Sequence, residues 1–498
     1  MLENADVPLI KNYEDFKKLN NTLKSSEVSL SIFQIDRVSS KDSYIIITDL
    51  DSGVQKHLEL DDFVYYFVVN RTTVIKNGIS KLSKYNFTKL YLRTHPAVFD
   101  ADVKTYINGL ITMGYKEFKL LDFQLSLVGN EVIITSCDDM IKANKVIIPN
   151  CVTKIASCAF KENQNIEEVI FGDASNLTEI GNAAFSDSSI TAINIPSKVK
   201  EIKGEAFLNC YSLESVTFAS NSNLEIIGQR AFSHCKFKSL SIPNSVRMIG
   251  WGAFEVCSLL EEINIPQRVT KIEEDTFKQC HRLKTVVRLG KSTIKIIESD
   301  AFSFCYALKS FKLDGVNSIG YQAFSLSGLE VVDVPSSVKS LSPYAFRGCF
   351  NLKSAKLPEN ILELPEGVFS DCEKLESIEL PSNLKVIGPY AFMNTGFKTI
   401  KNLPKWLKVI GHSSFMKCKK LDSVELPNSV EKISMYAFAD CMNLKEINIP
   451  KNLKEFTITA LHQSYCLQKV YVCGDSITHN PELKNLKNVL KRVEFVLR

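Results

Sequence analysis

The sequence predicts an α/β fold: a solenoid of about 14 coils with parallel strands, plus a small mixed α/β N-terminal domain and a C-terminal cap. Two observations predict it. An Ala-Phe pair or a close variant recurs at spacings of 22 to 25 residues, and ten of the 16 prolines occupy one place in this repeat. A period of about 20 to 29 residues is typical of leucine-rich repeats, whose units stack because none can bury its apolar side alone. The repeated phenylalanine stands at 160, 185, 207, 232, 254, 277, 302, 324, 346, 369, 392, 415 and 438, and Leu461 takes its place in a decayed last copy.

One unit shows how each coil is expected to fold. Val424 and Leu426 alternate as inward side chains of a strand, and Pro427 ends the strand because proline has no backbone donor. Val430 and Ile433 follow at intervals of three, which predicts a short helical or irregular crossing. The phenylalanine then fills the interior of the turn.

The extent of the repeat predicts three parts of the chain. These are a mixed α/β domain (residues 1–145), the solenoid (residues 146–473) and a cap helix (residues 474–498). Asn480 and Pro481 are favourable residues for the start of that helix. Its apolar side would cover the last coil, as terminal repeats require. That side consists of Leu483, Leu486, Leu490 and Val493.

The N-terminal domain contains a predicted strand-helix-strand unit followed by a hairpin. Residues 88–94 and 116–123 have the composition of strands, and residues from about 101 to 113 have the periodicity of a helix. Residues 125–135 carry a Gly-Asn pair between apolar runs, which predicts a hairpin. The hairpin leads into the first solenoid strand at Val146, so we expect it to shield the first coil.

Composition excludes several classes of function. The net charge of +4, from 60 basic and 56 acidic residues, is too balanced to attract nucleic acid or an anionic membrane over long range. The N-terminus lacks the features of a secretory signal, and no window approaches the roughly 18 apolar residues of a membrane helix. These observations predict a cytoplasmic protein.

Cysteine recurs three residues after the phenylalanine, and Asn, Ser or Thr takes that place in other coils. Neighbouring cysteines would lie near the separation of bridged cysteines, about 5 to 6 Å between alpha carbons, so disulfides are possible. Because the count is odd and small polar residues substitute freely, we favour semi-buried free thiols. A zinc site is less favoured, since a single file does not supply paired ligands at short spacing. The nine cysteines are at 210, 235, 257, 280, 305, 349, 372, 418 and 441.

Charged residues on the outward positions of the predicted strands alternate in sign from one coil to the next. In a parallel sheet these residues would be lateral neighbours, so opposite charges would meet and fix the register. Two interpretations remain: a self-neutralised solvated surface, or a face that recognises a partner with complementary stripes. This candidate interaction face consists of Lys309, Lys312, Glu330, Asp333, Lys353, Lys356, Glu376, Glu379, Lys398, Lys401, Asp422 and Glu425.

The repeat pattern L-x-x-[IV]-x-[IL]-P-x-x-V-x-x-I-x-x-x-A-F-x-x-C resembles the BspA-like leucine-rich repeat, also called the Treponema pallidum type. Residues 240–257 and 424–441 carry it almost unbroken. The resemblance covers about two thirds of the chain and implies a leucine-rich-repeat solenoid. Members include bacterial surface antigens that adhere to host matrix proteins, and the family supplies no catalytic residues. The resemblance therefore implies a cell-surface adhesin.

Motifs for catalysis or cofactor binding are not found in the sequence. There is no phosphate-binding glycine motif, no H-E-x-x-H and no Cys-x-x-Cys pair. His234, His281 and His412 fall in turn positions where polar surface residues are expected, while Trp251 and Trp406 are candidate contact anchors or residues packed on the adjacent coil. We therefore predict a non-enzymatic scaffold with no cofactor and no metal, which binds an unknown protein partner. The alternatives are an adhesin, or an enzyme whose activity is confined to residues 1–145 with the solenoid as a docking arm.

Overall fold

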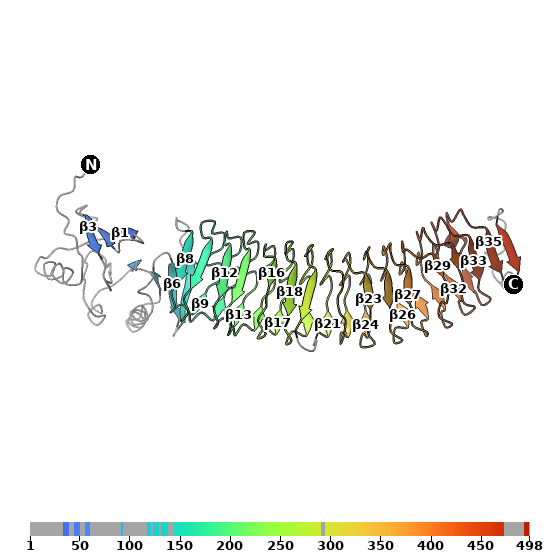
Figure 1. Ribbon diagram of the computed structural model, residues 1–498, viewed down its shortest axis with the longest axis horizontal. Helices are drawn as coiled ribbons and strands as arrows, with labels where there is room; N and C mark the ends of the chain where they lie inside the picture. Colours follow the sequence, from blue (N-terminus) through green and yellow to red (C-terminus); the bar gives the residue numbers. More distant parts are fainter. Residues whose placement is uncertain are drawn as a thin grey trace, which may run out of the picture. The chain divides into compact units, whose positions relative to one another are not determined.

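Parallel sheets wound from successive coils make up most of the structure, which confirms the predicted solenoid (Figure 1). The chain divides into two compact units, Met1–Ala206 with Phe218–Ser222 and Phe207–Thr217 with Asn223–Arg498. The computed structural model describes residues 33–38, 44–49, 55–59, 91–92, 117–120, 123–128, 131–137, 144–289, 294–472 and 493–497.

The first unit begins with two groups of strands. The strands β1 (Phe33–Val38), β2 (Tyr44–Asp49) and β3 (Gln55–Glu59) form an antiparallel sheet. The strands β4 (Tyr91–Leu92) and β5 (Glu117–Leu120) pair in parallel, as a strand-helix-strand unit requires, and both fall within predicted strand segments. The helix predicted between them lies outside the described residues.

The predicted hairpin is confirmed, because β6 (Phe123–Val128) and β7 (Glu131–Cys137) pair in antiparallel fashion. The strand β7 also pairs in parallel with β9 (Lys154–Ile155) of the first coil. The ring of Phe123 lies 5.8 Å from the ring of Phe160, so the hairpin contributes to the same core. The hairpin thus covers one sheet edge of the first coil, as expected.

The solenoid coils of the first unit contribute to two parallel sheets. One contains β8 (Lys145–Ile148), β10 (Glu168–Phe171) and β12 (Ala192–Ile195). The other contains β9, β11 (Glu179–Ile180) and β13 (Glu201–Ile202). The strand β14 (Ser215–Phe218) follows in the chain.

The second unit continues with the strand predicted before each proline. Its side chains alternate between the core and solvent, and Ala355 and Ile378 of neighbouring strands are direct register partners. These strands are β16 (Ser239–Leu240), β18 (Glu262–Ile265), β20 (Thr285–Arg288), β23 (Val331–Asp333), β25 (Ser354–Lys356), β27 (Ser377–Glu379), β29 (Thr399–Ile400), β31 (Ser423–Val424), β33 (Glu446–Ile449), β35 (Lys469–Val472) and β36 (Glu494–Leu497). We call the surface that these strands present the strand side.

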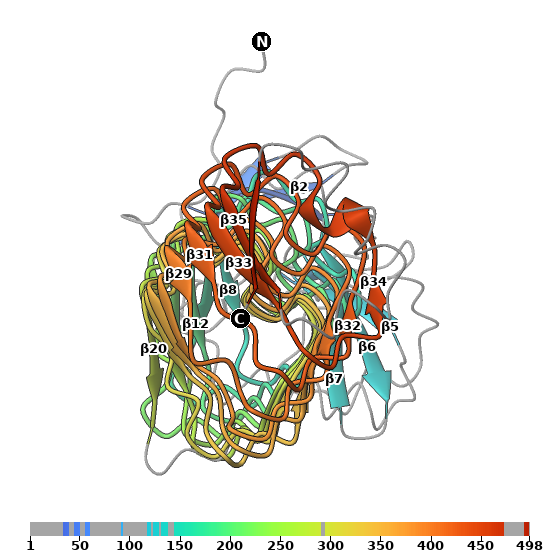
Figure 2. The same ribbon diagram turned by 90° about the vertical axis from the view of Figure 1, so that its right-hand side faces the viewer.

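A second short strand follows in each coil, so the prediction of a helical or irregular crossing was wrong. Its two residues pair in parallel with the next coil, and the second of them is an apolar residue that is buried in all of these strands except the one that ends at Leu341. Two residues are too few to show a period of two in the sequence. Figure 2 shows β31 and β33 on one side of the coils and β32 and β34 on the other. These strands are β15 (Ile226–Ile227), β17 (Met248–Ile249), β19 (Lys271–Ile272), β21 (Ile296–Ile297), β22 (Ser318–Ile319), β24 (Ser340–Leu341), β26 (Glu363–Leu364), β28 (Val386–Ile387), β30 (Val409–Ile410), β32 (Lys432–Ile433) and β34 (Glu455–Phe456), followed by the 3-10 helix Ile458–Leu461.

The third side of each coil is the turn that carries the phenylalanine. In every coil with this phenylalanine, the residues two before and two after it have a positive φ. That conformation lets alternate N–H groups point at the next coil. The N–H of Phe346 donates to the carbonyl of Val368 (3.0 Å) and the N–H of Gly348 to that of Ser370 (2.7 Å). These bonds offset the cost of positive φ, which is about 1–2 kcal/mol for a residue other than glycine.

The repeated phenylalanines stack along the core of the second unit. Successive ring centroids from Phe207 to Phe438 lie 5.1 to 6.0 Å apart, with interplanar angles of 22° or less. Phe254, Phe346 and Phe438 are fully buried in this one column. The predicted continuous interior of stacked coils is therefore confirmed.

The C-terminal end differs from the prediction in one segment. Residues 473–492, where the helix was expected, lie outside the described residues, so that helix stays a prediction. The strand β36 pairs in parallel with β35, with Glu494 opposite Lys469 and Leu497 opposite Val472. The helical cap expected up to residue 498 is wrong for 494–497, because this backbone adds a strand to the sheet instead.

Candidate interaction surface on the strand side

The charged residues predicted on the strand side are lateral neighbours. Lys356 is the register partner of Asp333 on one side and of Glu379 on the other. The charged residues that stand three positions earlier in each coil are neighbours as well. The N–H of Lys353 donates to the main-chain carbonyl of Glu330 (2.8 Å). We call each outward charged pair of one coil a rung. The rungs are Lys309/Lys312, Glu330/Asp333, Lys353/Lys356, Glu376/Glu379, Lys398/Lys401 and Asp422/Glu425.

Several rungs form ion pairs with their neighbours. The Nζ of Lys356 lies 3.0 Å from a carboxylate oxygen of Glu379, and this hydrogen bond raises the pKa of Lys356. Glu330 lies between Lys353 (3.4 Å) and Lys309 (3.5 Å), which together hold the pKa of its carboxyl below the usual value. The predicted contact between opposite charges is confirmed for these pairs.

Other charges of the rungs form no ion pair with a neighbouring rung. Glu376 contacts Lys420 (3.5 Å) rather than a lysine of the adjacent rungs. Within the part of the chain that the structure describes, six rung residues have no ion-pair partner within 4.0 Å. These are Lys312, Asp333, Lys398, Lys401, Asp422 and Glu425. The surface is thus only partly self-neutralised.

In the preceding coils of the second unit, the residue at the first position of the rung also alternates in charge from one coil to the next. Glu214, Lys238, Glu261 and Lys284 occupy this place, and Lys284 lies 2.7 Å from Glu261. The alternation stops where Lys284 is followed by Lys309. Residues 308–313 of the coil of Lys309 form no strand, so the strand side has no strand between β20 and β23. The six-rung array therefore begins at Lys309.

An exposed group of aromatic side chains lies at the turn that leads into the charged strands. The rings of His281 and Tyr306 stack at 5.2 Å, Tyr306 lies 6.3 Å from Phe350, and Phe304 packs edge-on against Tyr306 at 6.2 Å. Tyr306 is 41% and Phe350 is 37% exposed, and because the two rings contact each other they form one exposed patch rather than scattered single side chains. We call these four residues the aromatic strip.

Glycine makes the aromatic strip continuous. Tyr306 and Phe350 belong to coils on either side of the coil of Gly328. A Cβ at Gly328 would lie 2.1 Å from the carbonyl oxygen of Tyr306, so the backbones approach too closely for any other residue. Because glycine has no side chain, the two rings lean toward each other across this position. The sequence signal that we missed is the residue four after the repeated phenylalanine, which is aromatic or histidine at 211, 281, 306 and 350 and joins the strip at the last three.

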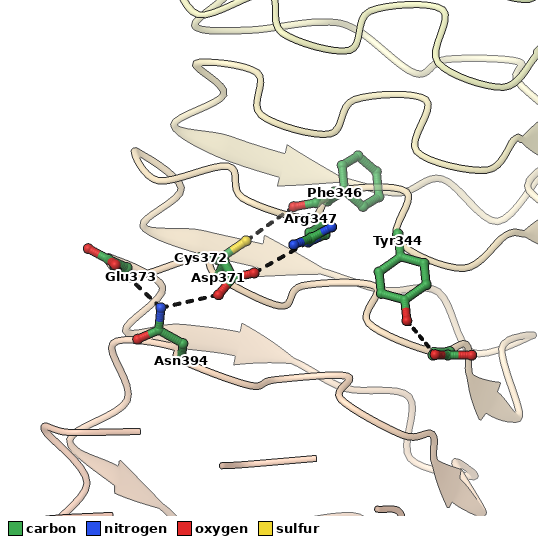
Figure 3. Close-up of polar contacts among 8 residues, drawn as sticks. Tyr344, Phe346, Arg347, Asp371, Cys372, Glu373 and Asn394 are labelled. Carbon is green, nitrogen blue, oxygen red and sulfur yellow. Dashed lines mark hydrogen bonds and ion pairs between the residues drawn. The ribbon is translucent and has the colours of Figure 1, made fainter. Parts of the chain in front are cut away.

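Polar contacts connect neighbouring coils on the turn side as well (Figure 3). Asp371 accepts hydrogen bonds from Arg347 (3.3 Å) and Asn394 (3.2 Å), and Asn394 also donates to Glu373 (3.3 Å). The hydroxyl of Tyr344 donates to Glu366. These carboxylates therefore accept hydrogen bonds from side chains of neighbouring coils, and these bonds hold adjacent coils together.

The cysteine column has a structural role. The repeated cysteines from Cys235 to Cys441 are thiols and not disulfides, which supports the thiol interpretation, and they are fully buried rather than semi-buried as predicted. The thiol of Cys257 donates to the carbonyl of Phe232 in the preceding coil (3.1 Å), and Ser464 makes the same contact with Phe438 (2.8 Å). Asn163 at the same place instead accepts hydrogen bonds from the N–H groups of Asn165 and Ile166 (both 3.0 Å). The position therefore selects a small side chain, as expected, and the cysteines and Ser464 add a hydrogen bond to the preceding coil. Burial raises the pKa of Cys257 to about 12, so this thiol is not a nucleophile near neutral pH.

The tryptophans and histidines singled out in the sequence have different surroundings. Trp251 donates to Gln229 (3.0 Å) and lies under the guanidinium of Arg230 (5.9 Å), so it packs on the adjacent coil. Trp406 is 66% exposed. His412 packs edge-on between Tyr390 and Tyr436, whereas His281 belongs to the aromatic strip. Burial lowers the pKa of His234.

Features of a metal site or a membrane span are not found in the residues that the structure describes. Nowhere among them do three or more His, Cys, Asp or Glu side chains group so that they could hold a metal ion. In the same residues, no helix has the length and apolar character that a membrane crossing requires.

Comparison with known families agrees with the repeat geometry. The family described as "BspA type Leucine rich repeat region (6 copies)" matches residues 135–235, 225–353, 288–399 and 339–468. The chain belongs to the BspA-type leucine-rich repeat family. No curated protein matches the chain. The family assignment confirms the resemblance found in the sequence.

Several solved leucine-rich repeat proteins are similar to the chain, and the first of them shares its fold. A protein from Bacteroides ovatus has 24% sequence identity and a TM-score of 0.62, over 76% of this chain and 99% of that protein. A Treponema pallidum leucine-rich repeat protein has 28% identity and a TM-score of 0.34, over 38% of this chain and 88% of its own. A leucine-rich cell surface protein from Faecalibacterium prausnitzii has 21% identity and a TM-score of 0.42, over 74% and 97%.

Proposed function

We propose that this BspA-type protein is a non-enzymatic scaffold that binds a protein partner on its strand side. The observation that carries the proposal is the aromatic strip, which lies beside the charged rungs. Tyr306 precedes Lys309 by three residues, and Phe350 precedes Lys353 by three residues, so ring and charge recur together. Exposed aromatic side chains next to charged residues are features of protein-binding surfaces.

The physical reason is the cost of exposing these rings. Tyr306 and Phe350 contact each other but remain partly exposed to water, so a partner that covers them gains hydrophobic burial without a large cost in side-chain entropy. The exposed lysines beside them, Lys309 and Lys353, would favour carboxylates of the partner.

The test compares the full-length protein with two double variants in quantitative affinity capture. Tyr306→Ala with Phe350→Ala removes the aromatic strip, and Tyr211→Ala with Tyr465→Ala removes two exposed rings outside it. A partner of the strip is lost from the first variant, at least about tenfold, and retained by the second. Identical capture by both variants and the parent protein would reject the strip as the binding site.

Display at the cell surface as an adhesin is a second candidate function. Family membership supports it, because BspA-type proteins include surface antigens. The cytoplasmic location that we predicted from the N-terminus is the competing proposal. Antibody staining of unpermeabilised cells separates them: signal before permeabilisation supports the adhesin, and signal only afterwards supports the cytoplasmic scaffold.

A further inference from the structure

We propose that the charged rungs form a self-complementary interface, on which a second copy of this chain docks face to face with its coils running in the opposite direction. The proposal rests on the proposed function, because it names a partner for the strand side. The two-fold axis would run parallel to the strands, between the rung Lys353/Lys356 and the rung Glu376/Glu379.

The alternation of charge makes this arrangement complementary at every rung. A two-fold axis between adjacent rungs brings Lys353 opposite Glu376 of the second copy, and Lys356 opposite Glu379. The same operation brings Glu330/Asp333 opposite Lys398/Lys401, and Lys309/Lys312 opposite Asp422/Glu425. All twelve charges of each copy then face the opposite sign, as an isologous interface requires. An axis through a rung, by contrast, would bring that rung opposite itself.

The rungs keep their order along the whole array. Asp333, Lys356 and Glu379 are register partners in one sheet, and main-chain bonds link Lys398 to Asp422 (2.9 Å) in another. Between these two sheets the coils remain stacked, because the rings of Phe369 and Phe392 lie 6.0 Å apart and nearly parallel. The repeat of the charges is thus the spacing of the coils.

The kind of partner follows from this repeat. Adjacent coils lie about 4.8 Å apart, and the sign of the charge alternates from one coil to the next. The electric field of such a pattern therefore cancels close to the surface, within less than the screening length of about 8 Å in physiological salt. Another surface can therefore interact with this pattern only in direct contact, and only if its own charges repeat at the same spacing. Another stack of parallel strands has that repeat, and a second copy of this chain also has the matching order of signs.

The residues between the two charged columns allow close approach. Each of the six coils carries a small outward side chain between its two charges: Ser310, Val331, Ser354, Ser377, Thr399 and Ser423. Next to the axis, Ser354 would face Ser377. Val331, which is 57% exposed, would face Thr399 and lose its exposure to water. The charged side chains of the two copies can therefore interleave on both sides of this central line of small residues.

The expected dimer is weak and sensitive to salt. Six rungs extend over roughly 25–30 Å, which gives an interface at the small end of specific complexes. Salt screens the exposed ion pairs between the two copies. Charges that already form an ion pair within one copy, such as Lys356 with Glu379, would also have to interact with the second copy. Sedimentation equilibrium of the full-length protein should show dimers at low ionic strength that dissociate as salt is added.

Charge reversal tests the arrangement itself. Lys353→Glu with Lys356→Glu, and separately Glu376→Lys with Glu379→Lys, place like charges opposite each other next to the axis. Each variant alone should raise the dimer Kd at least about tenfold. An equimolar mixture of the two variants should recover the dimer, because the reversed rungs then face each other with opposite signs. Recovery in the mixture cannot result from damage to folding, since both components carry their substitutions.

The matched control is Lys339→Glu with Lys385→Glu, an equal change of charge at exposed lysines away from the strand side. This variant should dimerise as the parent protein does. A parent protein that stays monomeric at low salt, or a mixture that stays monomeric, overturns the proposal. Partner capture that still depends on Tyr306 and Phe350 in that case leaves the proposed function standing, so the two failures are distinguishable.

Discussion

The rings of Tyr306 and Phe350 lie 6.3 Å apart, although a whole coil separates the two residues along the solenoid. Gly328 of the intervening coil makes this contact possible, because a Cβ there would meet the carbonyl of Tyr306 at 2.1 Å. An exposed pair of rings is thereby built from residues 44 positions apart in the sequence.

Gly328→Ala should destabilise the protein by about 1–3 kcal/mol, because the backbone of one coil must move away from the next to admit a methyl group. Denaturant-induced unfolding measures the change. Ser258→Ala is the matched control, since Ser258 has the same place in a coil that already carries a Cβ. Equal stability of Gly328→Ala and the parent protein would show that the close approach has no energetic consequence.

The donor role of the cysteine column predicts an order of stability. Cys257→Ser keeps a hydrogen bond to the carbonyl of Phe232, as Ser464 does to Phe438, whereas Cys257→Ala loses it and leaves a small cavity. The serine variant should be more stable than the alanine variant by about 1 kcal/mol. Thermal unfolding of both variants gives the comparison, and the reverse order would mean that packing alone determines this position.

Thiol reactivity should separate exposed from buried cysteines. Iodoacetamide at pH 7 to 9 should modify Cys158 and Cys466, which are exposed, and leave Cys257 unmodified. Burial raises the pKa of Cys257 to about 12, so its thiol stays protonated throughout this range and is also shielded from the reagent. Peptide mapping by mass spectrometry shows the sites. Modification of Cys257 at the rate of Cys466 would contradict the burial of the column.

The repeat itself could be predicted from sequence because its signals are local. The phenylalanine, the proline and the alternating strand residues such as Val424 and Leu426 recur at a fixed spacing, so the core and the strand before Pro427 followed directly. The second strand was missed because two residues such as Lys432 and Ile433 show no period. The positive φ at Tyr344 and Gly348 was missed because unlike residue types share it.

The candidate surface was only half predictable for a related reason. The charges of Lys356 and Glu379 repeat regularly, so their lateral contact could be inferred from a parallel register. The aromatic strip has no such regularity. It depends on the short coil around Gly328 and on side chains that lean along the solenoid axis, which only the three-dimensional arrangement shows.

Glu431 should contribute to the pH dependence of stability. Hydrogen bonds from Lys408 (2.5 Å) and Lys454 (2.8 Å) lower the pKa of its carboxyl to about 2. Because the folded pKa lies below the unfolded value, this contribution is present above about pH 4.3 and is lost as the pH falls toward 2. Glu431→Gln should therefore lower the melting temperature at pH 7 more than at pH 2. Glu363→Gln, at an exposed carboxylate on the same sheet, is the control that should show no such difference.

The lateral ion pairs of the strand side should contribute measurably to folding. Glu376→Lys with Glu379→Lys removes the contacts with Lys420 (3.5 Å) and Lys356 (3.0 Å), and it places like charges beside Lys353 and Lys356. Each exposed pair contributes well under about 1 kcal/mol, so the melting temperature should fall modestly, and the fall should shrink in high salt. The control is Glu274→Lys with Glu363→Lys, which changes the charge equally at exposed carboxylates outside the rungs. If the rung variant melts at the temperature of the parent protein in low salt, then the alternating charges do not hold the coils in register, and their order of signs must be explained by what the strand side binds.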